Sequence, residues 1–166
     1  MKSVCYGATD VGRCRQNNED TYLLQPVGDD SHLLAVVVDG LGGHEGGEIA
    51  AALAAKCMVD YLEGLSVEEL GLDALKQSVI YANNSIVSQQ VNPRWYNMGC
   101  VLTALLFDFG QAVAYLCHVG DTRCYQFGEG ALTKLSRDHS LVGIEEDEGR
   151  LTEEEAMHHP RRNVIT

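Results

Sequence analysis

The chain has 166 residues, with 12 basic and 24 acidic side chains and a formal net charge of −12 when histidine is neutral. This acidity disfavours nucleic acid and anionic lipid as partners, whereas it favours divalent cations. The length suits a single domain that spans residues 1–166. No apolar run approaches the ~18 residues of a membrane span, so we expect a cytoplasmic protein without a membrane partner.

The cysteines also favour a cytoplasmic protein. The six cysteines form no CxxC pair, and most of them lie within apolar runs. Such residues are typical of buried, reduced thiols in a cytosolic protein, rather than of zinc ligands or a disulfide framework.

The first part of the chain alternates between strand and helix patterns. Residues 4–8, 21–27 and 32–38 are predicted strands, and the unbroken aliphatic run at 33–38 predicts a strand covered on both faces. Two helices are predicted at residues 46–63 and 72–91. Ser66 and Glu69 form a capping box, which we place before the second helix.

The second part begins with strands again. Residues 100–109, 111–119 and 123–127 are predicted strands, the last followed by a turn at residues 128–130. From Asp138 onward the sequence is acidic and helical, with a capping box at Thr152 and Glu155. Strands, then helices, then strands predict an α+β fold with an antiparallel sheet, because the regular βα alternation of a parallel sheet is absent.

A glycine-rich loop after the strand at 32–38 is the strongest candidate site. Asp39 leaves the strand, and five glycines follow from Gly40 to Gly47. Neither a P-loop nor a dinucleotide loop fits, since the Lys-Ser/Thr pair is missing and Glu45 replaces the third glycine. Acidic residues and no Arg or Lys occupy the loop, so a phosphate could bind only with a cation. A metal site and a capping Asp beside flexible glycines are both compatible with this segment.

Two further loops offer carboxylates. Glu19 and Asp20 precede a strand, with Arg15 four residues before Glu19, and Asp121 leaves another strand through a glycine. A surface ion pair or a simple turn would explain each loop alone. Together, the oxygen ligands favour Mg²⁺ or Mn²⁺, and arginine suits bidentate contact with phosphate.

Several motifs occur in a fixed order along essentially the whole chain: Arg15-x-x-Asn18-Glu19-Asp20, Asp39-Gly40-x-Gly42-Gly43-His44, Met98-Gly99, Gly120-Asp121-Thr122-Arg123, Asp138-His139-Ser140 and His159-Pro160-x-Arg162-Asn163. This order resembles the metal-dependent (type 2C, PPM) protein serine/threonine phosphatases of the bacterial type. The resemblance implies a β-sandwich of antiparallel sheets flanked by helices, an αββα arrangement. It also implies hydrolysis of phosphoserine and phosphothreonine in proteins by metal-activated water.

The resemblance also assigns roles to residues. It implies that Asp39 bridges two Mn²⁺ or Mg²⁺ ions and that the Gly40 carbonyl binds one of them. Glu19 and Asp20 would hold metal-bound water, and Arg15 would bind the substrate phosphate.

Two roles are less direct. Asp121 resembles the acid that helps to bind a third, weaker metal in bacterial members. Eukaryotic relatives carry a histidine at the position of Leu41, which cannot donate a proton, so water is the expected acid for the leaving group. His44 is an alternative donor, although a histidine within a glycine loop more often anchors that loop.

The family pattern normally continues beyond Thr166 with about a third more chain, including two late aspartates that bind metal. We therefore expect reduced metal occupancy and self-association through an uncovered sheet. The segment at 136–159 resembles the family's flap, and we expect it to be mobile. A catalytically impaired pseudophosphatase or regulatory binding module is the alternative function, while a calcium-binding structural protein is disfavoured because no EF-hand spacing occurs.

Overall fold

The computed structural model describes residues 4–42 and 46–166. The chain divides into two compact units, one formed by the chain up to Cys100 together with Ala104–Cys117, the other by Val101–Thr103 and His118–Thr166. None of the helices in the described residues is both long and apolar enough to cross a membrane. All six cysteines are free, but the prediction that they are buried is wrong for most of them: only Cys57 is buried, whereas Cys5 and Cys14 are exposed.

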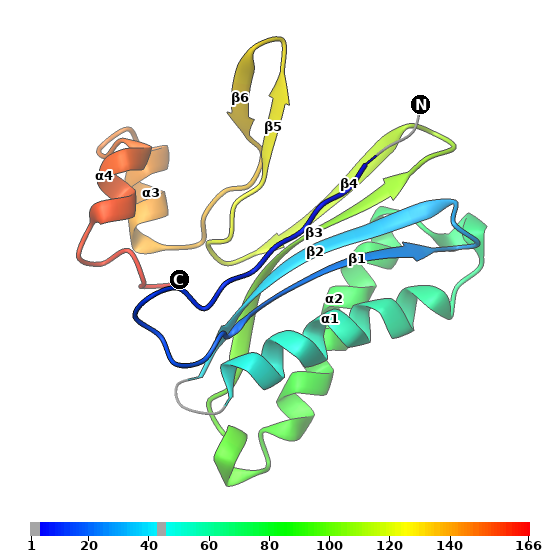
Figure 1. Ribbon diagram of the computed structural model, residues 1–166, viewed down its shortest axis with the longest axis horizontal. Coiled ribbons are helices and arrows are strands. Elements are labelled where there is room, and N and C mark those ends of the chain that lie inside the picture. The colour runs from blue at the N-terminus through cyan, green and yellow to red at the C-terminus, as the bar shows by residue number, and fades with distance from the viewer. Residues whose placement is uncertain (1–3, 43–45) are drawn as a thin grey trace. The chain divides into compact units, whose positions relative to one another are not determined.

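A four-stranded sheet with two covering helices dominates the fold. The strand order is β1-β2-β3-β4, and β1 pairs antiparallel with β2. Helices α1 and α2 pack against each other on one face of this sheet (Figure 1). The bounds are Asp20–Val27 (β1), His32–Leu41 (β2), Gly99–Asp108 (β3), Val113–Val119 (β4), Gly47–Glu63 (α1) and Leu72–Gln89 (α2).

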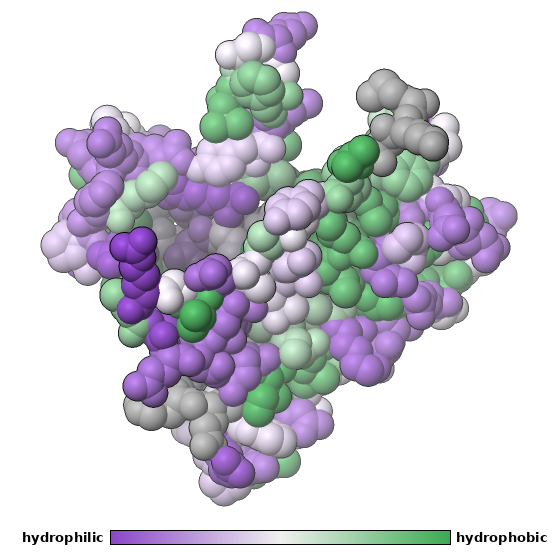
Figure 2. Space-filling view, in the orientation of Figure 1, coloured by the Kyte–Doolittle hydropathy of each residue, from purple (hydrophilic) through white to green (hydrophobic). Residues whose placement is uncertain are grey.

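The core lies between the sheet and these helices. Val36 and Val38 of β2 are buried, whereas Val37 between them is 52% exposed. The prediction that this strand is covered on both faces is therefore wrong, because successive strand side chains point to opposite faces and the helices cover one of them. Figure 2 shows apolar side chains over the strands, and the exposed ones include Tyr22, Val37 and Val113.

The turn between β1 and β2 has unusual backbone angles. Gly28, Asp29 and Asp30 have φ values of 61°, 54° and 62° in succession. Glycine adopts this left-handed region at no steric cost, and aspartate tolerates it better than most residues. The Ser31 amide donates to the Gly28 carbonyl at 3.0 Å and closes the turn.

A partly buried chain of polar side chains connects this turn to the end of β3. The Ser31 hydroxyl lies 2.8 Å from His32 Nδ1, and His32 Nε2 lies 3.6 Å from Asp108 Oδ2. The Phe109 amide also donates to the Ser31 carbonyl at 3.1 Å. The turn end of the β1–β2 hairpin is thus held both by contacts between neighbouring residues and by contacts with the end of β3.

The second unit contains a hairpin and two short helices. Strands β5 (Tyr125–Gly128) and β6 (Ala131–Lys134) pair antiparallel, and helices α3 (Leu141–Asp147) and α4 (Glu153–His158) follow. Strand β6 was not predicted, whereas β5 overlaps the predicted strand at 123–127. The capping box at Thr152 and Glu155 is confirmed at the start of α4.

Two other predictions are wrong. Residues 4–8 are not a strand: Val4 and Tyr6 are almost fully exposed, and no strand of the described chain pairs with them. Without a ladder partner, an extended segment gains neither hydrogen bonds nor burial. The Ser66–Glu69 capping box exists, but it caps the short 3₁₀ turn η1 (Val67–Glu69) instead of α2. A second 3₁₀ turn, η2 (Pro93–Trp95), precedes β3.

Candidate metal and phosphate site

Two carboxylates face each other at one end of the β1–β2 hairpin. The strand register places Asp20 directly opposite Asp39, and both residues line the same cavity. Like charges directly opposite each other destabilise a strand pair. A bound cation would turn this repulsion into attraction, so the arrangement favours a metal site over a simple turn.

The cavity has a volume of about 230 Å³ and belongs to the first unit. It brings together four of the residues that the sequence singled out, together with four others, and its lining consists of Asp10, Val11, Arg15, Asn17, Asn18, Glu19, Asp20 and Asp39. Arg15 Nη1 contacts Glu19 Oε2 at 3.2 Å, and most of the arginine side chain is exposed. Exposure leaves the rest of its guanidinium available to an anion.

Asn18 organises the segment that carries the acids. Its side-chain oxygen accepts a hydrogen bond from the Asp20 amide at 3.1 Å, and its amide nitrogen donates to Thr9 Oγ1 at 2.8 Å. This asparagine therefore holds the start of β1 in place. Asp10, whose carboxylate accepts from the Gly12 amide at 2.7 Å, also lines the cavity, but nothing in its sequence context indicated this.

The glycines serve backbone packing. A Cβ on Gly40 would lie 2.1 Å from the Gly47 carbonyl oxygen and 2.7 Å from that of Glu19. The Gly40 amide donates to the same Glu19 carbonyl at 3.1 Å. Strand β2 and the start of α1 thus meet backbone to backbone, which no side chain at Gly40 would allow.

Met98 fills the space beside the other glycines of this loop. A Cβ on Gly42 would lie 3.0 Å from Met98 Cα, and one on Gly46 would lie 2.9 Å from Met98 Cβ. Gly42 also has a φ of 156°. These contacts give a packing reason for the Met98-Gly99 motif. His44 and Glu45, weighed above as a proton donor and a source of negative charge, lie outside the described residues.

The charge of Asp39 acts on the Cys100 thiol, an interaction that was not predicted from the sequence. Burial and the neighbouring carboxylate raise the pKa of this thiol to about 11. In the metal-free chain Cys100 is therefore a thiol and not a thiolate at neutral pH.

Asp121 belongs to the second unit and lines a cavity of about 290 Å³ there. Burial, reinforced by the charge of Asp138, raises the pKa of the Asp121 carboxyl. Gly120 before it has a φ of 101°, and a Cβ there would lie 2.1 Å from Val101 Cγ1. The loop thus needs glycine at this position. Its predicted link to a third metal stays a prediction.

A histidine pair supports the Asp121 loop and makes its stability depend on pH. His118 Nδ1 lies 2.8 Å from Thr103 Oγ1, and the His118 and His139 rings are 5.0 Å apart. Burial, followed by the charge of His139, lowers the pKa of His118. The unfolded chain then binds more protons than the folded one, so stability is lost as pH falls below the unfolded value of about 6.5.

We therefore expect a His118→Asn variant to lose less stability than the parent chain between about pH 7 and pH 5. Urea unfolding at a series of pH values measures this, and the slope difference should correspond to less than one proton. Parallel pH profiles for the two chains would contradict it.

The oxygen donors of the first unit fit a hard cation in part. Within residues 4–42 and 46–166, no group of three or more His, Cys, Asp or Glu side chains could hold a metal ion. An ion held by Asp39 and nearby backbone oxygens would therefore keep several waters, which Asp20 could orient. This suits Mg²⁺ or Mn²⁺ better than Zn²⁺, because hard ions accept oxygen ligands and keep several waters.

Comparison with known proteins gives a consistent result. Residues 13–166 match the family described as protein phosphatase 2C. The serine/threonine protein phosphatase PstP of Mycobacterium tuberculosis is 39% identical over 161 residues, which cover 95% of this chain and 29% of PstP. The serine/threonine phosphatase stp of Listeria welshimeri is 33% identical over 162 residues, covering 95% of this chain and 63% of stp. The chain therefore spans less than two thirds of the length of these relatives.

Solved structures agree with these relatives. The crystal structure of M. tuberculosis PstP matches with a TM-score of 0.75 at 35% identity, over 93% of this chain and 63% of that chain. Stp1 from Staphylococcus aureus matches with a TM-score of 0.82 at 28% identity, over 96% and 63%. A PstP catalytic domain in complex with two manganese ions matches with a TM-score of 0.72 at 34% identity, over 87% of this chain and 60% of that chain. These likenesses bear out the predicted antiparallel sheets flanked by helices, and the chain belongs to the protein phosphatase 2C family.

Proposed function

We propose that this chain acts in the metal-dependent hydrolysis of phosphoserine and phosphothreonine in proteins. The opposed carboxylates of Asp20 and Asp39, in one cavity with Arg15, carry the proposal. Family membership and the printed names of the relatives support it. The reaction adds water across the phosphoester, so that one P–O bond forms to water and the bond to the serine or threonine oxygen breaks.

Each residue of the site has a proposed task. Asp39 and the Gly40 carbonyl would hold Mn²⁺ or Mg²⁺, with Asp20 and Glu19 orienting water around the ions. Divalent ions, when bound, attract phosphate oxygens and acidify water. Arg15 would hold the substrate phosphate by charge-assisted hydrogen bonds.

Leu41 has no proton to give, so the departing oxygen would take its proton from water. The PstP structure with two manganese ions supports a two-ion site in that relative, and we extend this two-ion site to the present chain. Asp121 is a candidate ligand of a third ion. We infer a cytoplasmic role in bacterial signalling, with phosphoproteins as substrates. Self-association through the exposed sheet face stays a prediction.

The test is phosphate release from a phosphothreonine peptide with Mn²⁺, with and without a chelator. An Arg15→Ala variant should lose about 10- to 100-fold in kcat/KM, which corresponds to one or two charge-assisted hydrogen bonds. Arg13→Ala is the matched control, because Arg13 is also exposed but does not line the cavity.

Equal losses in the two arginine variants would contradict the role of Arg15. Manganese binding without hydrolysis by the parent chain would favour the alternative of a catalytically impaired binding module.

A further inference from the structure

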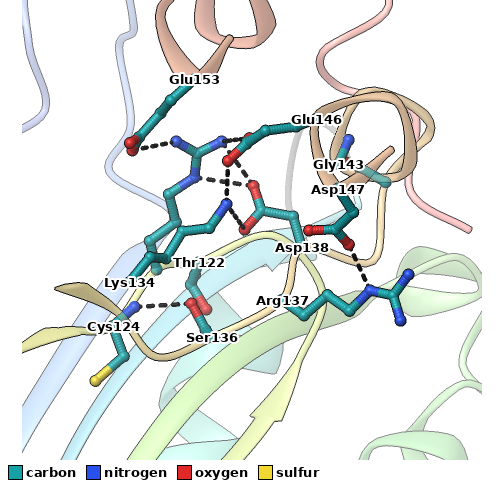
Figure 3. A network of polar contacts seen from close by, with 12 residues as sticks. Thr122, Cys124, Lys134, Ser136, Arg137, Asp138, Gly143, Glu146, Asp147 and Glu153 are labelled. Carbon is teal, nitrogen blue, oxygen red and sulfur yellow. Dashed lines mark hydrogen bonds and ion pairs between the residues drawn. The ribbon is translucent and has the colours of Figure 1, made fainter. Parts of the chain in front are cut away.

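Arg123 forms the centre of an ion-pair cluster in the second unit. Its Nε and Nη2 donate to Asp138 Oδ2 at 2.8 and 2.7 Å, and its Nη1 donates to Glu153 Oε1 at 2.7 Å. Nη2 also contacts Glu146 Oε2 at 3.3 Å. Figure 3 shows the three carboxylates converging on this point. One planar guanidinium therefore serves three acids.

The partners come from separate elements. Glu146 lies in α3 and Glu153 in α4, at 23 and 30 residues from Arg123. Lys134 of β6 adds a second cation, which contacts Glu146 and lies 3.9 Å from Asp138 Oδ1. The cluster thus joins the base of the β5–β6 hairpin to both helices. We call the segment Leu141–His158, which contains α3 and α4, the arm.

The cluster is more buried than the other ion pairs of the arm. The side chain of Arg123 is 17% exposed and that of Asp138 is 3% exposed. Removing one partner of such a pair leaves a buried charge uncompensated, which costs far more than breaking an exposed pair. Lysine cannot replace Arg123, because a single ammonium group lacks the planar fork that reaches three acids.

The arm also forms one wall of the cavity beside Asp121. Asp121, Arg123 and Asp138 line this cavity together with residues from both helices, namely Val142, Ala156 and Met157. A shift of the arm would therefore change the shape of the cavity.

We propose that Arg123 is the positioning residue that holds the arm in place and thereby shapes the cavity beside Asp121. The arm is then a fixed part of the second unit, contrary to the mobility expected for a flap-like segment. The effect on substrate rests on the proposed phosphatase function, whereas the tether itself does not.

Hydrogen–deuterium exchange of the metal-free chain tests the tether. Arg123→Lys keeps the charge but removes the fork, and we expect amides of the arm to exchange at least about tenfold faster. Arg137→Lys is the matched control: Arg137 also contacts the arm, through Asp147 of α3, but its side chain is 73% exposed. Exchange in this control should stay within about twofold of the parent. Amides of α1 and α2 should be unchanged in both variants.

Unchanged exchange of the arm in Arg123→Lys would overturn the tether. Equal acceleration in Arg137→Lys, or acceleration throughout the chain, would overturn it as well. If Arg123→Lys does not fold, exchange in a Glu153→Gln variant tests the tether instead, because the Glu153 side chain is 41% exposed and tolerates change. This variant should accelerate exchange in α4, and its failure to do so would also overturn the proposal.

Kinetics test the consequence for the cavity. Arg123→Lys should raise the KM for a phosphothreonine peptide severalfold, with a smaller change in kcat and in the hydrolysis of a small aryl phosphate. Accelerated exchange with unaltered kinetics would overturn the positioning role. Absence of turnover in the parent chain would count against the proposed function alone, because the exchange experiment needs neither metal nor substrate.

Discussion

An Asp39→Asn variant is expected to bind Mn²⁺ more than about 100-fold more weakly than the parent chain. Second-shell substitutions at metal sites typically cost 10- to 100-fold in affinity, and loss of a carboxylate that contacts the ion should cost more. The variant removes one of the two facing charges that make the site attractive to a cation. Isothermal titration with Mn²⁺ measures the affinity directly, and phosphate release should fall in parallel.

Two further variants sharpen this test. Asp60→Asn removes a carboxylate of the exposed Lys56–Asp60 pair on α1 and should leave Mn²⁺ affinity unchanged. Asp20→Asn should weaken binding by about 10- to 100-fold, as expected for a residue that orients water. Unaltered Mn²⁺ binding in Asp39→Asn would show that the ion binds elsewhere.

The second large effect is structural. Gly40→Ala is expected to lower the free energy of unfolding by at least about 3 kcal/mol, the upper part of the usual range for overpacking. Its Cβ would lie 2.1 Å from the Gly47 carbonyl oxygen, and backbone atoms cannot rotate away as a side chain can. Strand β2 and α1 would have to separate, which would displace Asp39 as well. Urea unfolding gives the free energy, and Mn²⁺ titration reports on the site.

Gly99→Ala is the control for this prediction. Gly99 begins β3 in the same sheet, but a Cβ there would meet no atom within 4 Å. Its stability should change by less than about 1 kcal/mol. Similar losses in the two variants would mean that the contact between Gly40 and Gly47 is not what makes glycine necessary.

Residues that act locally could be predicted from the sequence. Asp39, Asp20 and Glu19 sit next to strand patterns, so their place at strand ends followed from their neighbours. Helix α1 and strand β1 were predicted to within one residue for the same reason, whereas β2 runs to Leu41, three residues beyond its predicted end, and includes Asp39. The capping box at Ser66 was also real, but a four-residue motif does not reveal whether a long helix or a single turn follows it.

Contacts between distant segments could not be predicted in this way. The ion pairs of Arg123 join residues 15 to 30 positions apart, and every one of them depends on how the second unit folds. The exposure of Val37 likewise depends on which face the helices cover, which a run of valines does not show. The glycine loop was predicted to admit a ligand, whereas its tight contacts with Gly47 and Met98 exist only in the folded chain.

The turn at residues 28–31 sets the register of the hairpin that carries Asp20 and Asp39. Because the strands pair continuously from Val27 and His32 to Asp20 and Asp39, the number of residues in the turn decides which side chains face each other at the other end. A slip of one residue would move Asp39 to the opposite face and set it against a different neighbour. The pairing of Asp20 with Asp39 at one end of the hairpin thus depends on the length of the left-handed turn at the other end.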